Sequence, residues 1–337
     1  MDELHRLVDD LGRQSFDARM GRRTRPETLD TQLLRHLEET GLSRLTSAEG
    51  AGPAESAVVL AGLARHGAAV PVAETDVLAG WLAGRAGFEV STGALTVAVG
   101  SAEINAGRLA CVARDVPWPQ DTTILLAAQD AEHVYVAVLD DPPVTLSHNL
   151  AGEPRGTVTI DVPVGDCSTL DLALADELML RGAWARCVQT VGALDAAAEL
   201  TVAHTRTREQ FGRPLSRFQA VQHALAAMAG EIERARAVTD LAVAATVDHG
   251  FDSPAAEYAI TTAKVTVGGA VEPVTTIAHQ LHGAIGVTAE HPLWLFTMRA
   301  RSWVDEFGTT AHHAGILGRR ALTAADPWDV VVGPRSH

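Results

Sequence analysis

Twelve residues between two alanine-rich runs gather side chains that suit an anionic ligand. The segment 208–219 contains three arginines, two glutamines, two phenylalanines, one glycine and one proline. An arginine at a helix end, together with backbone N–H donors, binds pyrophosphate oxygens well. Arg208 suits this role, and the amide of Gln219 could satisfy ribose or adenine groups. Taken alone, the segment is also compatible with an ordinary helix–helix connection in which Gly212 is a capping glycine.

A glycine-containing turn further along the chain has complementary chemistry. Residues 280–288 begin with Gln280 and carry Gly283 and Gly286 in the turn. A glycine lets a ligand approach the backbone closely because it has no Cβ. The two segments together supply a cation, backbone donors and amide groups, so we predict a dinucleotide-binding site.

The histidines and cysteines do not form a metal-binding pattern. His279 and His282 lie three residues apart and His312 and His313 are adjacent, but no carboxylate stands at ligand spacing with them. The three cysteines are widely spaced and form neither a disulfide framework nor a zinc motif. We therefore expect no metal, and thiols kept free in a reducing cytoplasm.

The overall composition narrows the class of protein. The 337 residues are 47% hydrophobic and carry a net charge of −15. The acidic balance argues against nucleic acid or an anionic membrane surface as partners. No run approaches the roughly 20 apolar residues of a membrane span, and the mixed charge of the first residues is not typical of a signal peptide. The expected location is the cytoplasm.

The hydrophobic pattern predicts helices up to about residue 75, including 29–41 and 55–66. From about 76 to 165, short β-branched and aliphatic runs alternate with turn residues, which is typical of a small, mostly antiparallel β-domain. Strands are expected at 94–100, 122–127, 134–139 and 157–162.

The rest of the chain is predicted to form an antiparallel helical bundle. One long helix is expected over 170–209, a second with Ser216 as its N-cap, and a third that begins at Pro254. Two more follow at 290–308 and 310–324. The fold class is therefore α+β, mainly α. The expected domains are N-terminal helices at 1–75, a β-domain at 76–165, and a bundle with the oligomer interface at 166–337.

This organisation resembles the acyl-CoA dehydrogenase family. The stretch from Arg208 to Gly212 looks like the family's arginine-x-x-phenylalanine-glycine segment, and residues 280–288 resemble its second signature, a glutamine followed by a glycine-rich turn. Lys264 and residues 303–308 also fit. The resemblance is closest over 166–325 and weakest through the β-domain.

The resemblance implies the family's fold and FAD as the cofactor, with both segments contacting the FAD of a neighbouring subunit. The family usually has a second glycine where this chain has Ala284. Seven residues are assigned in this way to the ADP half of FAD: Arg208, Gln210, Phe211, Gln219, Gln280, Gly283 and Ala284.

The resemblance also implies a carboxylate base, which removes the α-proton of an acyl-CoA while a hydride leaves to the flavin. The family commonly places this glutamate directly before Gly-Thr, where this chain has Phe307. Glu306 is one residue earlier, about 100° around a helix. Other members place the base where this chain has Gly182, more than a turn from Glu177. Glu306 is thus the catalytic candidate, and its competing role is a helix-end acid paired, for instance, with Arg301.

The β-domain lacks the family's flavin-covering stretches. Its nearest hydroxyls are Thr96 and Ser101, and its nearest tryptophan is Trp118. We therefore expect a subunit of an FAD-dependent acyl-CoA dehydrogenase that desaturates a CoA thioester. This chain would supply the ADP side of the FAD site, and a second, longer acyl-CoA dehydrogenase subunit would supply the isoalloxazine pocket and the base.

Short family members of this kind resemble subunits of α2β2 enzymes in actinobacterial steroid side-chain degradation. An acyl-CoA substrate, a heterotetramer and electron-transfer flavoprotein as a partner follow from that resemblance. Three alternatives stay open. The chain could be a self-sufficient homodimer or tetramer that uses Glu306, a non-catalytic scaffold, or a non-redox biosynthetic enzyme on the same fold.

Overall fold

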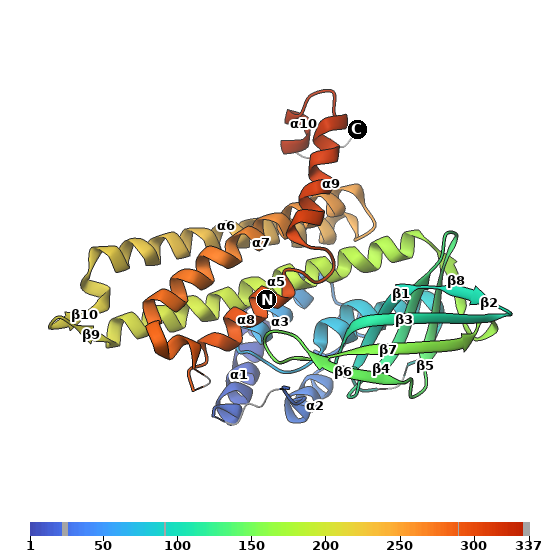
Figure 1. Cartoon of the computed structure of the whole chain (residues 1–337), viewed down its shortest axis with the longest axis horizontal. Coiled ribbons are helices and arrows are strands. Elements are labelled where there is room, and N and C mark those ends of the chain that lie inside the picture. Colours follow the sequence, from blue (N-terminus) through green and yellow to red (C-terminus); the bar gives the residue numbers. More distant parts are fainter. Residues whose placement is uncertain (22–25, 91, 289, 333–337) are drawn as a thin grey trace. The chain divides into compact units, whose positions relative to one another are not determined.

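The structure, a computed structural model, describes residues 1–21, 26–90, 92–288 and 290–332. Helices come first, strands in the middle and helices again at the end (Figure 1), which confirms the predicted fold class. The described residues form two compact units. The bundle unit comprises Met1–Phe16, Ala57–Gly67 and the chain from Ala183 onwards, and the sheet unit comprises Asp17–Ser56 and Ala68–Gly182. The three-domain division stays a prediction.

The N-terminal helices agree with the sequence pattern. They are α1 (Asp2–Arg19), α2 (Thr31–Glu39) and α3 (Pro53–Arg65). Asp30 caps α2 by accepting a hydrogen bond from the Leu33 N–H at 3.0 Å. The two helices predicted at 29–41 and 55–66 lie within two residues of the observed limits of α2 and α3, and the Asp30 cap marks the start of α2.

Helical structure continues where the β-domain was expected to begin. The π-helix η1 (Ala73–Gly80) and α4 (Trp81–Ala86) precede the first strand, so the expected change near residue 76 was wrong. Asp76 is buried inside η1 and accepts hydrogen bonds from the backbone and hydroxyl groups of Thr46 and Ser47. Burial raises the pKa of Asp76, and these donors oppose the rise. A polar stretch that is buried in this way has no apolar periodicity to reveal it.

Eight strands form two four-stranded sheets in the sheet unit, with the orders β1-β4-β5-β8 and β2-β3-β7-β6. All pairs are antiparallel except β1 with β4, so the mostly antiparallel prediction is confirmed. The four expected strands exist, and β2, β3, β6 and β8 were missed. The bounds are β1 (Leu95–Ser101), β2 (Glu103–Asn105), β3 (Arg108–Pro117), β4 (Thr123–Gln129), β5 (His133–Leu139), β6 (Val144–His148), β7 (Pro154–Pro163) and β8 (Ser168–Asp171).

The helices of the bundle unit follow the predicted order. Within the unit, α6 and α7 run side by side (Figure 1). The buried stripe of α6 has the three- and four-residue spacing of an amphipathic helix, with Met228, Ile232, Ala235, Thr239, Ala242 and Thr246 inward. The helix bounds are α5 (Ala173–Thr207), α6 (Gln219–His249), α7 (Pro254–His282), α8 (Leu293–Trp303), α9 (Thr310–Thr323) and α10 (Trp328–Val331).

Helix ends account for both agreement and error in the bundle. Ser253 caps α7 by accepting a hydrogen bond from the Ala256 N–H, directly before Pro254, as predicted. Ser216 is not the N-cap of α6, because it lies in a 3-10 turn (Leu215–Arg217) and the cap position is Phe218. Helix α8 ends at Trp303, earlier than the expected 308.

One close contact fixes the crossing of two helices in the bundle unit. A Cβ placed on Gly192 of α5 would lie 2.3 Å from the backbone oxygen of Ala61 in α3. Real Cβ atoms do not approach a carbonyl so closely, so the crossing requires a glycine here. In the described part of the chain, no helix has the length and apolar character needed to cross a membrane.

Candidate cofactor and active site

The arginine segment forms an exposed hairpin between α5 and α6. Two short strands, β9 (Glu209–Gln210) and β10 (Arg213–Pro214), pair across a turn made by Phe211 and Gly212. Both turn residues have positive φ, +53° and +77°, which matches the twist of a tight hairpin but strains a non-glycine residue. The Phe211 side chain is 92% exposed. A strained, exposed aromatic tip is unusual for a simple helix connection.

The second segment begins where α7 ends. Gly283 adopts φ +63° and ψ −144°, and a Cβ added there would meet no atom within 4 Å. The backbone therefore has open space beside it. Residues 283–287 continue as a 3-10 turn, with Gly283 and Ala284 exposed. This geometry supports close approach of a ligand to the turn.

All seven residues assigned from the sequence to the ADP half are exposed in the single chain: Arg208, Gln210, Phe211, Gln219, Gln280, Gly283 and Ala284. The two segments meet through a histidine contact that the sequence did not predict. His204 lies one turn before Arg208, and its ring stacks on that of His282 with centroids 4.5 Å apart. His282 directly precedes Gly283, so the end of α5 and the end of α7 are neighbours.

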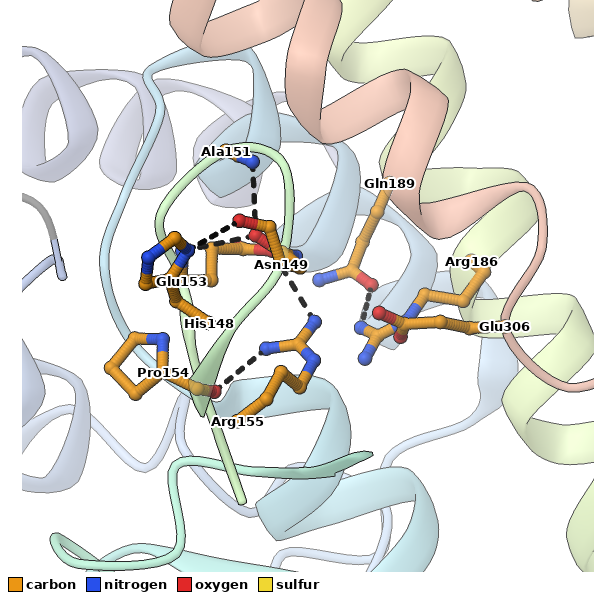
Figure 2. A network of polar contacts seen from close by, with 9 residues as sticks. All are labelled: His148, Asn149, Ala151, Glu153, Pro154, Arg155, Arg186, Gln189 and Glu306. Atoms are coloured by element: carbon orange, nitrogen blue, oxygen red, sulfur yellow. Dashed lines mark hydrogen bonds and ion pairs between the residues drawn. The ribbon is translucent and has the colours of Figure 1, made fainter. Parts of the chain in front are cut away.

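The catalytic candidate Glu306 is engaged in an ion pair. Its Oε2 accepts a hydrogen bond from Arg186 Nε at 2.7 Å (Figure 2). Arg186 is buried on α5 and also donates to the Gln189 side chain at 2.6 Å. The expected alternative partner was Arg301, but Arg301 instead donates to the Thr275 hydroxyl at 2.7 Å. Glu306 is therefore ion-paired, and its partner is Arg186 instead of Arg301.

A buried lysine holds the loop that carries Glu306. Lys264 Nζ donates to the carbonyl oxygens of Val304 and Glu306 at 2.8 and 2.7 Å. Lys264 is the only lysine among the 337 residues. Burial lowers the pKa of its amine. A compact ammonium can bond two carbonyls in a space that does not suit a planar guanidinium.

The residue in the family's usual base position is fixed in an uncommon conformation. Phe307 has φ +54° and Gly308 has φ +93°, and the Phe307 carbonyl lies 3.1 Å from His313 Nε2. A Cβ on Gly308 would lie 2.6 Å from that same nitrogen. These contacts turn the loop so that the Glu306 carboxylate meets Arg186.

Two carboxylates of the sheet unit, Glu177 and Glu153, are also paired. Glu177 accepts a hydrogen bond from Arg181 Nε at 2.9 Å, and the Arg181 guanidinium lies 4.3 Å from the Trp81 ring centre. The buried Glu153 accepts from Asn149 at 2.6 Å and lies 3.4 Å from Arg155 (Figure 2). None of these acids stands as an unengaged base.

The β-domain residues singled out from the sequence differ in exposure. Trp118 is buried, and its backbone N–H donates to the Pro154 carbonyl. Thr96 is fully buried, and its hydroxyl makes no hydrogen bond within the described residues, whereas Ser101 is exposed. Across the described ranges, no group of three or more histidine, cysteine or acidic side chains is arranged to hold a metal ion.

Arg186 and His204 are the functional candidates that the sequence analysis missed. Arg186 interrupts an otherwise apolar run, Ala183 to Val188, and a charge within such a run signals a buried ion pair. Its partner is 120 residues away, so the pairing had no local signal. His204 had a local signal, because it lies four residues before Arg208 and this spacing places both side chains on one helix face.

The C-terminal helical bundle is similar to a domain of known proteins. Residues 172–322 match the family model for the acyl-CoA dehydrogenase C-terminal domain. The chain is 33% identical over 167 residues to acyl-CoA dehydrogenase IpdE2 of Mycolicibacterium smegmatis. The aligned stretch covers 50% of this chain and 47% of that protein. It is 35% identical over 119 residues to 3-sulfinopropanoyl-CoA desulfinase of Paraburkholderia xenovorans, covering 35% of this chain and 29% of that one. The chain thus matches less than half the length of either relative.

Solved structures share the fold over nearly the whole chain. One is a chain of the ChsE4–ChsE5 complex from Mycobacterium tuberculosis, with a TM-score of 0.82 and 22% identity, covering 96% of this chain and 97% of that chain. Another is a chain of the Tcur3481–Tcur3483 steroid ACAD, with a TM-score of 0.79, 24% identity and 94% and 97% coverage. A third is a glutaryl-CoA dehydrogenase from Mycobacterium smegmatis in complex with FADH2, with a TM-score of 0.76, 17% identity and 96% coverage of both chains.

Residues 172–322 therefore match the C-terminal domain of the acyl-CoA dehydrogenase family, and the described chain has the fold of these solved structures. The recognition made from the two signature segments is confirmed.

The family is FAD-dependent, as predicted. The exposed Arg208 and the open turn at Gly283 fit the diphosphate end of FAD, because they offer a cation and an unobstructed backbone. The described residues fit the flavin end less well, since Glu306 is ion-paired and Trp118 is buried.

Proposed function

We propose that this chain is a subunit of an FAD-dependent acyl-CoA dehydrogenase and contributes the ADP side of an intersubunit FAD site. FAD, when bound, accepts the hydride in α,β-desaturation of a CoA thioester. Arg208 and the Gly283 backbone bind the diphosphate, and Gln210, Gln219 and Gln280 bind the ribose and adenine. Phe211 and Ala284 also contact the ADP half of FAD. The exposure of all seven residues in the single chain supports a site completed by another subunit.

The ion pair between Glu306 and Arg186 is the observation that carries the proposal. A general base must reach the substrate proton. The Glu306 carboxylate is instead paired with the buried guanidinium of Arg186, and Lys264 donates a hydrogen bond to the Glu306 carbonyl in the same loop. The second, longer acyl-CoA dehydrogenase subunit supplies the base and the isoalloxazine pocket. The likeness to one chain of the ChsE4–ChsE5 complex, which is itself a complex of two named components, agrees with a heterotetramer.

The partners of this assembly follow from the same proposal. The substrate is an acyl-CoA, and the steroid ACAD among the structural neighbours supports a steroid side-chain acyl group. Electron-transfer flavoprotein reoxidises the cofactor. The three unbridged cysteines agree with a cytoplasmic location.

Arg208 provides the direct test. The chain is co-expressed with the product of the adjacent open reading frame, and the flavin content of the purified complex is measured. Arg208→Gln should lower flavin retention at least fivefold, because the diphosphate loses its cation. Arg206→Gln is the matched control, since Arg206 is exposed on the same helix end but points about 200° away. Equal flavin content in the Arg208→Gln and Arg206→Gln complexes would contradict the proposal that this chain binds the ADP side of FAD.

A non-redox reaction on the same fold is the second candidate. It is favoured by the similarity to a protein named 3-sulfinopropanoyl-CoA desulfinase and by Phe307 in the usual base position. The two candidates differ in electron flow. A dehydrogenase bleaches its flavin absorbance when an acyl-CoA is added without an acceptor, whereas a non-redox enzyme turns over substrate with the flavin band unchanged.

A further inference from the structure

Three histidines meet where three helix ends converge in the bundle unit. His204 near the end of α5, His282 at the end of α7 and His291 before α8 form what we call the histidine cluster. Ring centroids lie 4.5 Å apart for His204 and His282, 4.7 Å for His282 and His291, and 6.4 Å for His204 and His291. The cluster borders both proposed ADP-binding segments, because Arg208 follows His204 by one turn and Gly283 follows His282 directly.

The hydrogen bonds fix where the neutral rings carry their protons. His282 Nδ1 lies 2.8 Å from the Ala278 carbonyl, so this nitrogen carries the hydrogen. His291 Nδ1 accepts from the Leu293 N–H at 3.2 Å, so the neutral ring carries its hydrogen on Nε2. His282 is 5% exposed, and its Nε2 makes no hydrogen bond within the described residues. The neutral cluster thus contains a buried nitrogen that is able to accept a proton.

The surroundings keep the cluster neutral. Burial lowers the pKa of His204, and the charges of His282 and Arg208 lower it further. Burial, His282 and His204 lower the pKa of His291, and burial lowers that of His282. A bound anion would offset the repulsion between Arg208 and a protonated imidazole.

A fourth imidazole extends the group toward α8. His279 Nε2 lies 2.9 Å from the Thr297 hydroxyl. Burial lowers the pKa of His279, with further lowering by Arg301 and His282. The charged groups that act on these rings are therefore arginines: Arg208, which directly follows α5, acts on His204, and Arg301 of α8 acts on His279. An added positive charge is unfavourable here until an anion arrives.

We infer that the histidine cluster is part of the diphosphate-binding end and takes up a proton when a diphosphate binds there. The inference rests on the proposed ADP side of the FAD site and adds His204 to it. Because the bound anion favours the protonated cluster, binding must tighten as pH falls. When one whole proton is taken up, the affinity for the diphosphate rises by at most about tenfold for each unit by which the pH falls.

Calorimetric titration of ADP into the flavin-depleted complex of this chain and the second subunit tests this linkage without any turnover. The dissociation constant is measured between about pH 6 and 8, where histidine protonation changes. The titration is repeated in buffers of different ionisation enthalpy, which reports the protons taken up per ADP. His204→Gln is compared with His249→Gln, since His249 is an exposed histidine at the far end of α6. His291→Gln provides a second cluster variant, and circular dichroism verifies that each variant is folded.

The expected result is proton uptake on ADP binding and at least threefold tighter binding at the lower pH. His204→Gln or His291→Gln should reduce the uptake, and His249→Gln should not. The terminal phosphate of ADP also exchanges protons in this pH range, so the wild type is compared with the cluster variants. The same proton exchange on ADP binding in the wild type, His204→Gln and His291→Gln would overturn this inference and leave the proposed function standing. No ADP binding at any pH would overturn both.

Discussion

Glu306 and Arg186 form an ion pair within the bundle unit, with 2.7 Å between the carboxylate Oε2 and the guanidinium Nε. The Arg186 side chain is almost fully buried and that of Glu306 is partly exposed. Removing one member of such a pair leaves a buried charge without compensation. We therefore propose that Glu306 stabilises the bundle and its loop and that a partner subunit supplies the base.

Replacing Glu306 by glutamine separates these two roles. In the assembled enzyme, Glu306→Gln should change kcat less than about threefold, because the base lies elsewhere, whereas loss of a general base costs about 10²–10⁴-fold. The chain should lose about 1–3 kcal/mol in its free energy of unfolding, measured by urea denaturation. Glu272→Gln, an exposed acid on α7, serves as the control. A hundredfold loss of kcat would restore Glu306 as the base.

Lys264 should be essential for the geometry of the same loop. Lys264→Met removes two hydrogen bonds to the Val304 and Glu306 carbonyls, and we expect unfolding to be easier by about 2–4 kcal/mol. Isotope labelling of lysine gives a single side-chain NMR signal, because the chain has one lysine. That signal should titrate below the ordinary lysine pKa, as burial lowers it. Titration at the ordinary value would mean that the amine is exposed to water.

Phe211 should matter for assembly and not for folding. Phe211→Asn places a residue that tolerates positive φ at a strained, exposed position, so unfolding stability should stay the same or rise by up to about 1 kcal/mol. Flavin retention by the co-purified complex should fall. Leu322→Asn, an exposed apolar residue on α9, controls for the loss of surface apolar area. The Phe211 ring has one edge contact in its own chain, with Phe218 at 6.2 Å between centroids. A clear drop in stability for Phe211→Asn would show that this contact stabilises the fold.

Mild acid should destabilise the chain without ligand. Burial lowers the pKa values of His204, His282 and His291 below the ordinary histidine value. The unfolded chain therefore binds protons more readily than the folded one. The free energy of unfolding is fully retained above about pH 6.5 and falls as pH drops below that value. Urea midpoints at several pH values should show this fall, and His204→Gln should reduce it. Constant midpoints down to pH 5 would contradict the buried cluster.

Much of the bundle was predictable because its signals are local. Ser253 and Pro254 start α7, Gly283 ends it, and the buried stripe of α6 repeats at three and four residues. The two signature segments were also local, and comparison with known proteins confirmed the family that they indicated.

The rest depended on contacts between residues far apart in the chain. Asp76 is buried in a π-helix where Thr46 and Ser47 supply its hydrogen bonds, whereas the β-domain was expected to begin at about residue 76. Glu306 could be found as an acid near the expected base position. Its partner could not, because Arg186 precedes it by 120 residues and no periodic pattern links the two.

The visible absorbance spectrum of the purified chain, alone and co-purified with the second subunit, tests the central claim most directly. We expect no stoichiometric flavin band for the chain alone, and a flavin band that bleaches on addition of an acyl-CoA once the partner is present. A stoichiometric flavin band in the chain alone that bleaches with an acyl-CoA would contradict it, because this chain would then hold the whole site and the base.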